Sequence, residues 1–387
     1  MPAPVATDPT PIRLLTVLGT RPEAIKLAPI VRACLQQPRI EHRLCSTGQH
    51  RQMLDHVLQV FGLTPDEDLQ LMRPGQSLNE LAAAAMLGVQ RVIRSFKPDW
   101  VMVQGDTTTA FTAALAAFHE RVRVVHVEAG LRTGNLQSPW PEELNRRAIG
   151  LFADLHCAPT EWAAGNLRRE GIADERIVVT GNSVIDALHW VDSRPDTPAS
   201  LQAFLGPLAP VVLGSGRRII LVTGHRRENL DAGLAQMCQS LKRLAARGNV
   251  EIVYPVHLNP AVRQQVQGLL SDTAGVHLTE PMDHPCFVAM LRRCHFVITD
   301  SGGVQEEAPG LGKPVLVTRD TTERPEAIEA GTALLVGRDG DRLVQQATRL
   351  LDDGHAYAAM AQARNPYGDG HAAERTVAAI LQASGTT

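Results

Sequence analysis

Short runs of mostly apolar residues recur along the chain, and each is followed by residues with helical spacing. In the first half these runs lie at residues 12–19, 42–48, 99–106, 122–130, 155–160 and 176–182. Strands that are apolar on both faces and alternate with helices are typical of a parallel sheet covered on both sides. The first half of the chain is therefore predicted to form one doubly wound α/β domain.

A second pattern of the same kind follows a segment rich in proline, glycine and serine at residues 192–216, whose composition predicts a linker. Its apolar runs lie at residues 217–224, 250–257, 276–280, 296–303, 314–318 and 333–337. The full length of 387 residues is also too great for one compact core. We expect two doubly wound domains, with a cleft where the carboxyl ends of their strands face each other.

Charge and cysteine content exclude several classes of function. The formal net charge of −3 provides no overall field for nucleic acid or an anionic membrane, so a phosphate group needs a local site. The six cysteines are scattered without a C-x-x-C pair, which argues against a zinc knuckle or a disulfide scaffold and predicts reduced, mostly buried thiols. The N-terminal residues lack the features of a signal peptide, and no window approaches ~18 apolar residues. A cytoplasmic protein without a membrane span is expected.

Acidic side chains follow two successive strands of the first predicted domain. Asp106 ends the run at 99–106, Glu128 ends the next, and Glu142 and Glu143 begin a helix after "SPWP". A simpler interpretation makes Asp106 or Thr107 a helix N-cap. Carboxylates crowded at neighbouring strand ends raise one another's pKa, which allows one protonated acid beside one ionised base near neutral pH.

Cations follow the first strand, in "LGTRPEAIKLAPI". Arg21 and Lys26 lie near a helix N-terminus, which already favours anions, so an anion site is predicted there; a capped helix with solvated charges is the alternative. The motif is not G-x-G-x-x-G, and a nicotinamide site is not supported.

The second predicted domain has polar residues at its own strand ends. His225 and Arg226 in "TGHRRENL" resemble a phosphate clamp or form a polar loop, and His257 in "YPVHLNP" is equally open to both interpretations. The most specific segment begins with "DSGG" at 300–303, where glycine lets the N–H groups of a helix start approach a pyrophosphate closely. Glu307 is placed to accept the hydroxyls of a ribose, and Arg324 adds a positive charge.

Together these segments resemble the non-hydrolysing UDP-N-acetylglucosamine 2-epimerases, a bacterial family that interconverts UDP-GlcNAc and UDP-ManNAc. The resemblance runs in unbroken order over residues 12–370, through "GTRPEAIK", "TGQHRQMLD", "QGDTTTA", "HVEAGLRTGN", "PWPEELNRR", "TGHRREN", "YPVHLNP", "DSGGVQEEAP" and "GKPVLVTRDTTERPEA". It implies two Rossmann-like domains of the GT-B type: residues 1–182 with a C-terminal helix at 371–387 crossing back, and a UDP-binding domain at 183–370. It also implies a homodimer, and a reaction that needs no nicotinamide and no metal.

The resemblance further implies a mechanism. UDP is eliminated with loss of the C2 proton to give a 2-acetamidoglucal, and is added back after protonation on the opposite face of C2. The matching residues are Asp106, Glu128, Glu142 and His225 for catalysis, and Arg21, Lys26, Arg146, Phe287, Ser301, Gly302, Gly303, Glu307 and Arg324 for substrate binding. Beside Phe287 the sequence departs from the commoner Asp-Tyr wording, because His284 follows Asp283. Which carboxylate acts on which face of C2 stays open.

Many members of the family also bind a second UDP-GlcNAc as an activator. The matching or neighbouring positions are Gln49, His50, Gln52, Gln76, Arg226 and His257. Gly75 precedes Gln76 where some strongly activated members carry arginine, so activation is a hypothesis.

Three other functions share parts of this pattern. A hydrolysing epimerase would release ManNAc and UDP, and a GT-B glycosyltransferase would need an acceptor groove that no segment indicates. A nucleotide-sugar sensor would not need the carboxylates. No nucleic acid or membrane partner is expected.

Overall fold

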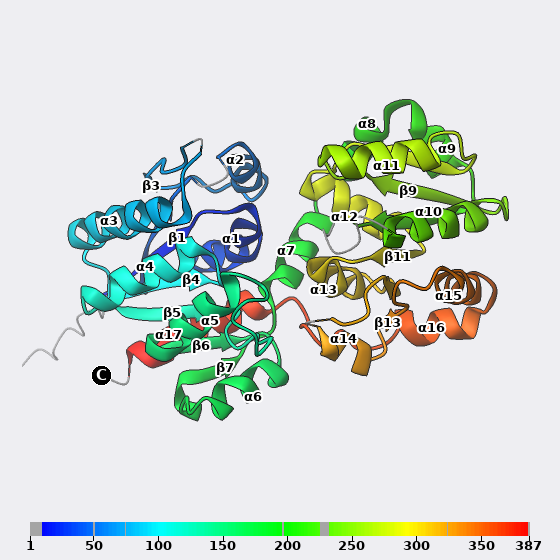
Figure 1. The fold of residues 1–387 in the computed structure, drawn as a ribbon. Helices are drawn as coiled ribbons and strands as arrows, with labels where there is room; N and C mark the ends of the chain where they lie inside the picture. Colours follow the sequence, from blue (N-terminus) through cyan, green and yellow to red (C-terminus); the bar gives the residue numbers. More distant parts are fainter. Residues whose placement is uncertain are drawn as a thin grey trace, which may run out of the picture. The chain divides into compact units, whose positions relative to one another are not determined.

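The computed structural model describes residues 10–48, 51–73, 75–195, 197–224, 232–322 and 324–385. These residues form two compact units, each built on its own sheet (Figure 1). The first unit contains the residues up to 187 together with the C-terminal segment from 367, and the second contains residues 188–366. The family resemblance implies the corresponding divisions after residues 182 and 370.

The sheet of the first unit has seven parallel strands in the order β3-β2-β1-β4-β5-β6-β7. They are β1 (Ile12–Leu18), β2 (Ile40–Ser46), β3 (Glu67–Asp68), β4 (Trp100–Gln104), β5 (Arg123–Val127), β6 (Leu155–Ala158) and β7 (Ile177–Val179). Six of these strands confirm the predicted apolar runs. The edge strand β3 is not predicted, because two acidic residues carry no strand pattern. The doubly wound fold is confirmed for this unit.

Helices cover both faces of this sheet. They are α1 (Arg21–Leu35), α2 (Arg51–Val60), α3 (Leu78–Phe96), α4 (Thr108–His119), α5 (Glu142–Phe152), α6 (Glu161–Arg169), α7 (Ser183–Asp192), which leads into the second unit, and the C-terminal α17 (Ala372–Ser384). Apolar residues four apart, such as Val92 and Phe96 of α3, pack with β1 and β4 in one core.

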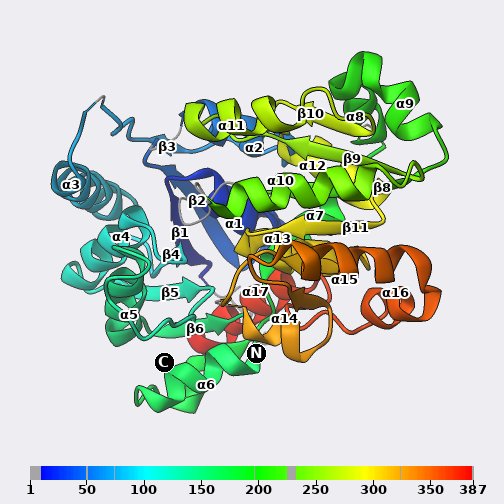
Figure 2. The same ribbon diagram turned by 45° about the vertical axis from the view of Figure 1, so that its right-hand side comes forward.

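The C-terminal helix α17 belongs to the first unit, where it packs on α1 and β6. Figure 2 shows it in red beside β6. The indole N–H of Trp100 donates to the Ser384 hydroxyl at 2.9 Å, and the Arg123 guanidinium lies 4.2 Å from the centre of the Trp100 ring. The end of the chain is therefore joined to the middle of the first sheet.

The second unit repeats the architecture with six parallel strands in the order β10-β9-β8-β11-β12-β13. They are β8 (Arg218–Thr223), β9 (Val250–Pro255), β10 (Val276–Thr279), β11 (Phe296–Thr299), β12 (Val315–Val317) and β13 (Ala333–Leu335). The helices are α8 (Thr197–Leu205), α9 (Ala209–Gly214), α10 (Ala232–Ala245), α11 (Pro260–Leu270), α12 (His284–Arg293), α13 (Gly302–Gly310), α14 (Pro325–Glu329), α15 (Gly340–Asp352) and α16 (Gly354–Ala361). All six predicted runs are confirmed as strands.

The predicted linker is largely helical, which corrects the sequence analysis. Within residues 192–216 the chain forms α8 and α9, and α8 packs on α12. Leu201 and Leu205, four residues apart, are buried on one face of α8. Proline is tolerated in a first helical turn, whose N–H groups have no partner within the helix, so the prolines of this segment do not prevent helix formation.

The cysteines agree with the sequence prediction, because all six are free thiols in buried positions. Burial raises the pKa of the Cys34 thiol to about 12, so it stays protonated. Among the helices in the described part of the chain, none has the length and apolar character needed to cross a bilayer.

Candidate active site

The carboxyl ends of β4 and β5 bring two predicted carboxylates together. The strands pair in register through Gln104 and Val127; Glu128 directly follows Val127, and Asp106 lies two residues beyond Gln104. The Thr107 hydroxyl is the N-cap of α4 and accepts the Ala110 N–H at 2.9 Å. The capping role therefore belongs to Thr107, and the Asp106 carboxylate does not serve as the cap.

Glu128 is held in an unusual conformation. Its φ angle is +60°, a left-handed conformation that is uncommon for residues with a side chain. The carboxylate forms an ion pair with Lys26 of α1 and accepts a hydrogen bond from the Gln104 amide. The side-chain N–H of Asn182 donates to the same carboxylate at 2.9 Å. Donors from three parts of the first unit therefore favour the ionised form of Glu128.

Asp106 has a different environment. The Arg146 guanidinium lies 2.6 Å from its carboxylate, and the Asn145 side chain donates to its backbone carbonyl at 2.9 Å. Its pKa is nevertheless raised, chiefly by burial; Arg146 opposes the rise, Glu128 and Glu142 add to it, and Lys26 opposes it. Asp106 is thus a carboxyl group whose pKa lies above its usual value, beside a second carboxylate that is paired with Lys26.

The start of α5 adds the third carboxylate. Glu142 is its first residue, and the Glu142 Oε2 atom is buried without a hydrogen-bond partner among the described residues. The next residue, Glu143, is fully buried and accepts the backbone N–H groups of Thr133 and Gly134 at 3.1 and 3.2 Å. Its carboxylate also lies 3.6 Å from Arg146, so Glu143 connects the loop after β5 to the cation beside Asp106.

A carboxylate of the chain itself lies at the N-terminus of α1. The carboxylate of Glu23, a fully buried residue, accepts the N–H groups of Gly19 and Thr20 at 3.1 and 2.7 Å and the Thr107 hydroxyl at 2.7 Å. Burial raises the pKa of Glu23, and these hydrogen bonds oppose the rise. These two N–H groups therefore bind the chain's own carboxylate, and the anion site around Arg21 and Lys26 stays a prediction. Arg21 lies partly buried at the start of α1, and Lys26 faces Glu128.

In the second unit, the "DSGG" turn forms the N-terminus of α13. Ser301 is the N-cap, its N–H donates to the Thr299 hydroxyl at 2.9 Å, and Gly302 and Gly303 open the helix. Glu307 lies on the same helix, 3.4 Å from a ring nitrogen of the buried His284. The helix start and Glu307 are therefore parts of one short element, as the sequence predicts.

Contacts with α13 hold Arg324 in place. Its guanidinium forms a buried ion pair with Glu306, the residue before Glu307. The Arg324 N–H donates to the Thr322 hydroxyl at 3.1 Å, and this hydroxyl donates to Gln305 at 2.7 Å. Arg324 therefore has a defined position relative to the N-terminal turn of α13.

The remaining predicted site residues lie in both units or outside the described residues. Phe287 is half-buried in the first turns of α12. His225, Arg226, Gln49 and His50 lie outside the described residues, and Gln52 belongs to α2. Gln76 accepts the Arg73 N–H at 3.2 Å in the first unit, and His257 accepts the Asn259 N–H at 3.1 Å in the second.

Sequence reasoning missed three residues of the first-unit cluster, Gln104, Asn145 and Asn182, and it named Glu143 beside Glu142 without giving it a role in the site. Gln104 and Asn182 lie at the carboxyl ends of β4 and β7. The rule that selected Asp106 and Glu128 could therefore have selected them too.

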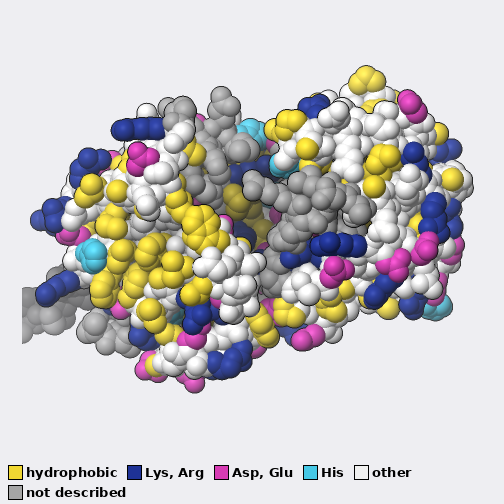
Figure 3. All heavy atoms as spheres, in the orientation of Figure 1, with side chains coloured by type: hydrophobic (Ala, Val, Ile, Leu, Met, Phe, Trp, Pro, Cys, Tyr) yellow, Lys and Arg dark blue, Asp and Glu magenta, His cyan; other side chains and the backbone are white. Residues whose placement is uncertain are grey.

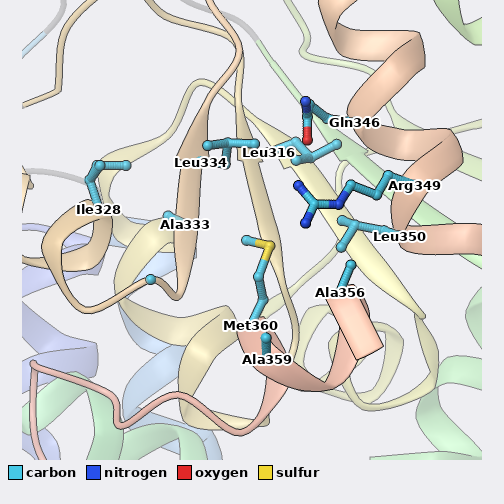
Figure 4. Close-up of a pocket in the computed structure, with 11 residues that line it drawn as sticks. Leu316, Ile328, Ala333, Leu334, Gln346, Arg349, Leu350, Ala356, Ala359 and Met360 are labelled. Carbon is cyan, nitrogen blue, oxygen red and sulfur yellow. The ribbon is translucent and has the colours of Figure 1, made fainter. Parts of the chain in front are cut away.

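The second unit also contains a pocket away from α13, with a volume of about 260 Å³. Apolar side chains from β12, β13, α14 and α16 line it, and Figure 4 shows Arg349 reaching into it from α15. None of the predicted site residues lines this pocket.

Comparison with known proteins gives one consistent result. Residues 32–381 match the family model described as UDP-N-acetylglucosamine 2-epimerase. The UDP-N-acetylglucosamine 2-epimerase of Salmonella typhimurium is 52% identical over 370 residues, which cover 95% of this chain and 98% of that protein. The crystal structure of UDP-GlcNAc 2-epimerase from Neisseria meningitidis bound to UDP-GlcNAc is 45% identical, with a TM-score of 0.88 and coverage of 96% of this chain and 100% of that one. The glycosyltransferase SnogD from Streptomyces nogalater is 20% identical with a TM-score of 0.60 and coverage of 97% and 100%, which shows a shared fold alone.

Proposed function

This chain belongs to the UDP-N-acetylglucosamine 2-epimerase family, and from that premise we propose that it interconverts UDP-GlcNAc and UDP-ManNAc reversibly, without hydrolysis. In the forward direction the C2 proton is removed, its electron pair forms the C1=C2 double bond of a 2-acetamidoglucal, and the C1–O bond breaks so that UDP leaves with that bond's electrons. Protonation on the other face of C2 and re-addition of UDP at C1 complete the reaction.

The observation that carries this proposal is the carboxylate cluster of the first unit. Proton removal and return at one carbon require both a base and an acid near neutral pH. Burial raises the pKa of Asp106, and we assign it the role of the acid. Glu128 is paired with Lys26, and we assign it the ionised form that accepts a proton. Glu142, whose buried Oε2 atom has no hydrogen-bond partner among the described residues, is proposed as a third catalytic carboxylate that contacts the reacting sugar.

The UDP half is proposed to bind the second unit. The N–H groups of Gly302 and Gly303 at the start of α13 are suited to a phosphate group, since a helix N-terminus attracts anions. Arg324 supplies a positive charge, and Glu307 accepts the ribose hydroxyls. Phe287 is assigned to the uracil. Arg21, Lys26 and Arg146 remain proposed cations of the first unit, and His225 remains a proposed catalytic residue outside the described part.

The test is incubation with UDP-GlcNAc in D₂O followed by NMR. Formation of UDP-ManNAc with deuterium at C2 is expected. Free ManNAc would instead identify a hydrolysing enzyme, and the absence of any exchange at C2 would exclude the elimination mechanism. Asp106→Asn, Glu128→Gln and Glu142→Gln should each reduce turnover about 100-fold or more while UDP binding is retained.

We also propose a homodimer that associates through one face of the first unit. Leu87 of α3, Phe118 of α4, and Leu144 and Leu151 of α5 are exposed on neighbouring helices; we call them the α3–α5 apolar face. Figure 3 shows apolar side chains gathered over these helices. A contiguous exposed apolar surface of this kind commonly marks a protein interface.

Activation by a second UDP-GlcNAc stays a proposal on the family resemblance. A lag in the conversion of UDP-ManNAc that added UDP-GlcNAc abolishes is the expected sign. Linear initial rates without added UDP-GlcNAc would argue against it.

A further inference from the structure

Asn182 lies between β7 and α7, and its side-chain amide bonds in two directions. The Oδ1 atom accepts the backbone N–H of Val184 at 3.1 Å, and the Nδ2 atom donates to Glu128 Oε1 at 2.9 Å. Because a backbone N–H can only donate, the first bond requires that the oxygen of the amide face Val184. The NH₂ group must therefore face Glu128.

The backbone around Asn182 is fixed by the C-terminal segment. The Asn182 N–H donates to the Tyr367 carbonyl at 2.6 Å. Gly181 and Gly368 pack so closely that a Cβ atom on Gly181 would lie 3.4 Å from the Gly368 Cα. The Asp186 carboxylate accepts the N–H groups of Ala372 and Ala373, the first residues of α17, at 3.2 and 2.8 Å. Asn182 is thus held by a segment almost two hundred residues away in sequence.

Asn182 is a neutral donor to Glu128 Oε1. Lys26 from α1 contacts the same oxygen, and Gln104 from β4 donates to Oε2. Asn182 is itself almost fully buried, so water does not readily replace its N–H. Since a hydrogen bond to an ionised carboxylate both orients and stabilises it, loss of this donor should change the reactivity of Glu128.

We propose that Asn182 is a positioning residue that fixes the carboxylate of Glu128 for proton transfer at C2 of the sugar. This inference rests on the proposed epimerase function and adds a residue to it. Asn182 acts through Glu128 and is not itself a catalytic residue.

The decisive variant is Asn182→Asp. An aspartate at this position keeps the oxygen that accepts the Val184 N–H, but it replaces the donor toward Glu128 with a second carboxylate. Among the described residues, Glu128 lies near Lys26 from α1, Gln104 and Asp106 at the end of β4, and His126 on β5. Two carboxylates beside one lysine raise the apparent pKa of the pair, so the acidic limb of the kcat profile should move to higher pH.

The expected result is a fall in kcat of roughly 10- to 100-fold with KM changed less than about threefold, together with that shift of the acidic limb. Asn182→Ser is the companion variant, because a hydroxyl can still accept the Val184 N–H but is too short to reach Glu128. It should lower kcat similarly without adding a charge, and so with a smaller shift of the limb. If the aspartate variant fails to fold because of its buried carboxylate, the serine variant still tests the proposal, since it introduces no buried charge.

Wild-type protein in the same D₂O experiment separates the two levels of inference. If the wild type exchanges no deuterium at C2, the proposed function is wrong. If the wild type exchanges and both variants keep wild-type kcat and an unshifted pH profile, only the role of Asn182 is overturned. A loss of kcat with unchanged UDP affinity and unchanged thermal unfolding midpoint supports it.

Discussion

The Arg146 guanidinium lies 2.6 Å from the Asp106 carboxylate, yet the pKa of Asp106 is raised. Burial removes the water that would solvate the ionised carboxylate, and this effect exceeds the attraction of Arg146. Arg146 is therefore a cation beside a carboxyl group whose pKa stays above its usual value.

Arg146→Gln should raise the pKa of Asp106 further, because the charge that opposes burial is lost. If protonated Asp106 is the acid, the basic limb of the kcat profile should move to higher pH by about one unit, alongside a lower kcat. Arg147→Gln is the matched control, since Arg147 is the next residue on α5 and pairs with Glu170 at 3.7 Å. An unshifted basic limb in the Arg146 variant would remove Asp106 from the role of acid.

Glu143→Gln tests the loop after β5. The amide keeps one acceptor for Thr133 or Gly134 and loses the charge that faces Arg146. We expect the free energy of unfolding to fall by about 1–3 kcal/mol, measured in urea, because buried groups lose a partner. Glu161→Gln, on an exposed side chain paired with Arg168, should change it by less than about 0.5 kcal/mol. Equal effects of the two variants would contradict the role given to Glu143.

Glu306→Gln should weaken UDP binding. The buried carboxylate of Glu306 holds Arg324, and a neutral amide leaves that guanidinium without its anionic partner. A rise in the UDP dissociation constant of about tenfold is expected by calorimetry, because Arg324 must then be ordered by the ligand itself. Glu329→Gln, at the exposed end of α14, is the control. Unchanged UDP affinity in the Glu306 variant would show that Arg324 does not contribute to UDP binding.

Stability should fall between about pH 6.5 and pH 4 because of His126. This ring is fully buried, its Nε2 lies 2.7 Å from the Gly105 carbonyl, and burial lowers its pKa to about 4. In that interval the unfolded chain binds a proton that the folded chain does not, so acidification favours unfolding, by up to about 3 kcal/mol for this ring.

Urea unfolding at several pH values measures this effect. His126→Gln keeps a donor for Gly105 and removes the titrating ring, so its stability should depend less steeply on pH over this interval. The exposed His119→Gln should retain the wild-type slope. A His126 variant with the wild-type slope would show that other groups, such as His156, govern the acid response.

Leu151→Arg tests the dimer. Leu151 is 77% exposed in the isolated chain, and a charge on the α3–α5 apolar face should prevent association because the dimer would bury an unpaired cation. Sedimentation should show a dimer for the wild type and for the second-unit control Val211→Arg, and a monomer for Leu151→Arg. A monomeric wild type would contradict the proposed homodimer.

Local pattern was sufficient for six of the seven strands of the first sheet, for all six strands of the second, and for placing Asp106 and Glu128 at neighbouring strand ends. Apolar runs define strands wherever both faces are buried, and successive strands β4 and β5 are neighbours, so residues at their ends had to meet. Proline content misled at residues 192–216, because α8 is stabilised by packing on α12 and not by its composition.

Only the tertiary structure decided which groups surround the carboxylates. By its position in the sequence, Glu23 is an ordinary acidic residue of a first helical turn, yet it is buried and accepts the N–H groups of Gly19 and Thr20 just before α1. Asn182 reads as a turn residue, and its contact with Glu128 depends on β5, β6 and β7 lying side by side and on the C-terminal segment fixing its backbone. Sequence periodicity reports which face of an element is buried, because burial is a property of each element. The partner of a polar atom depends on where distant elements pack, and that became known only with the fold.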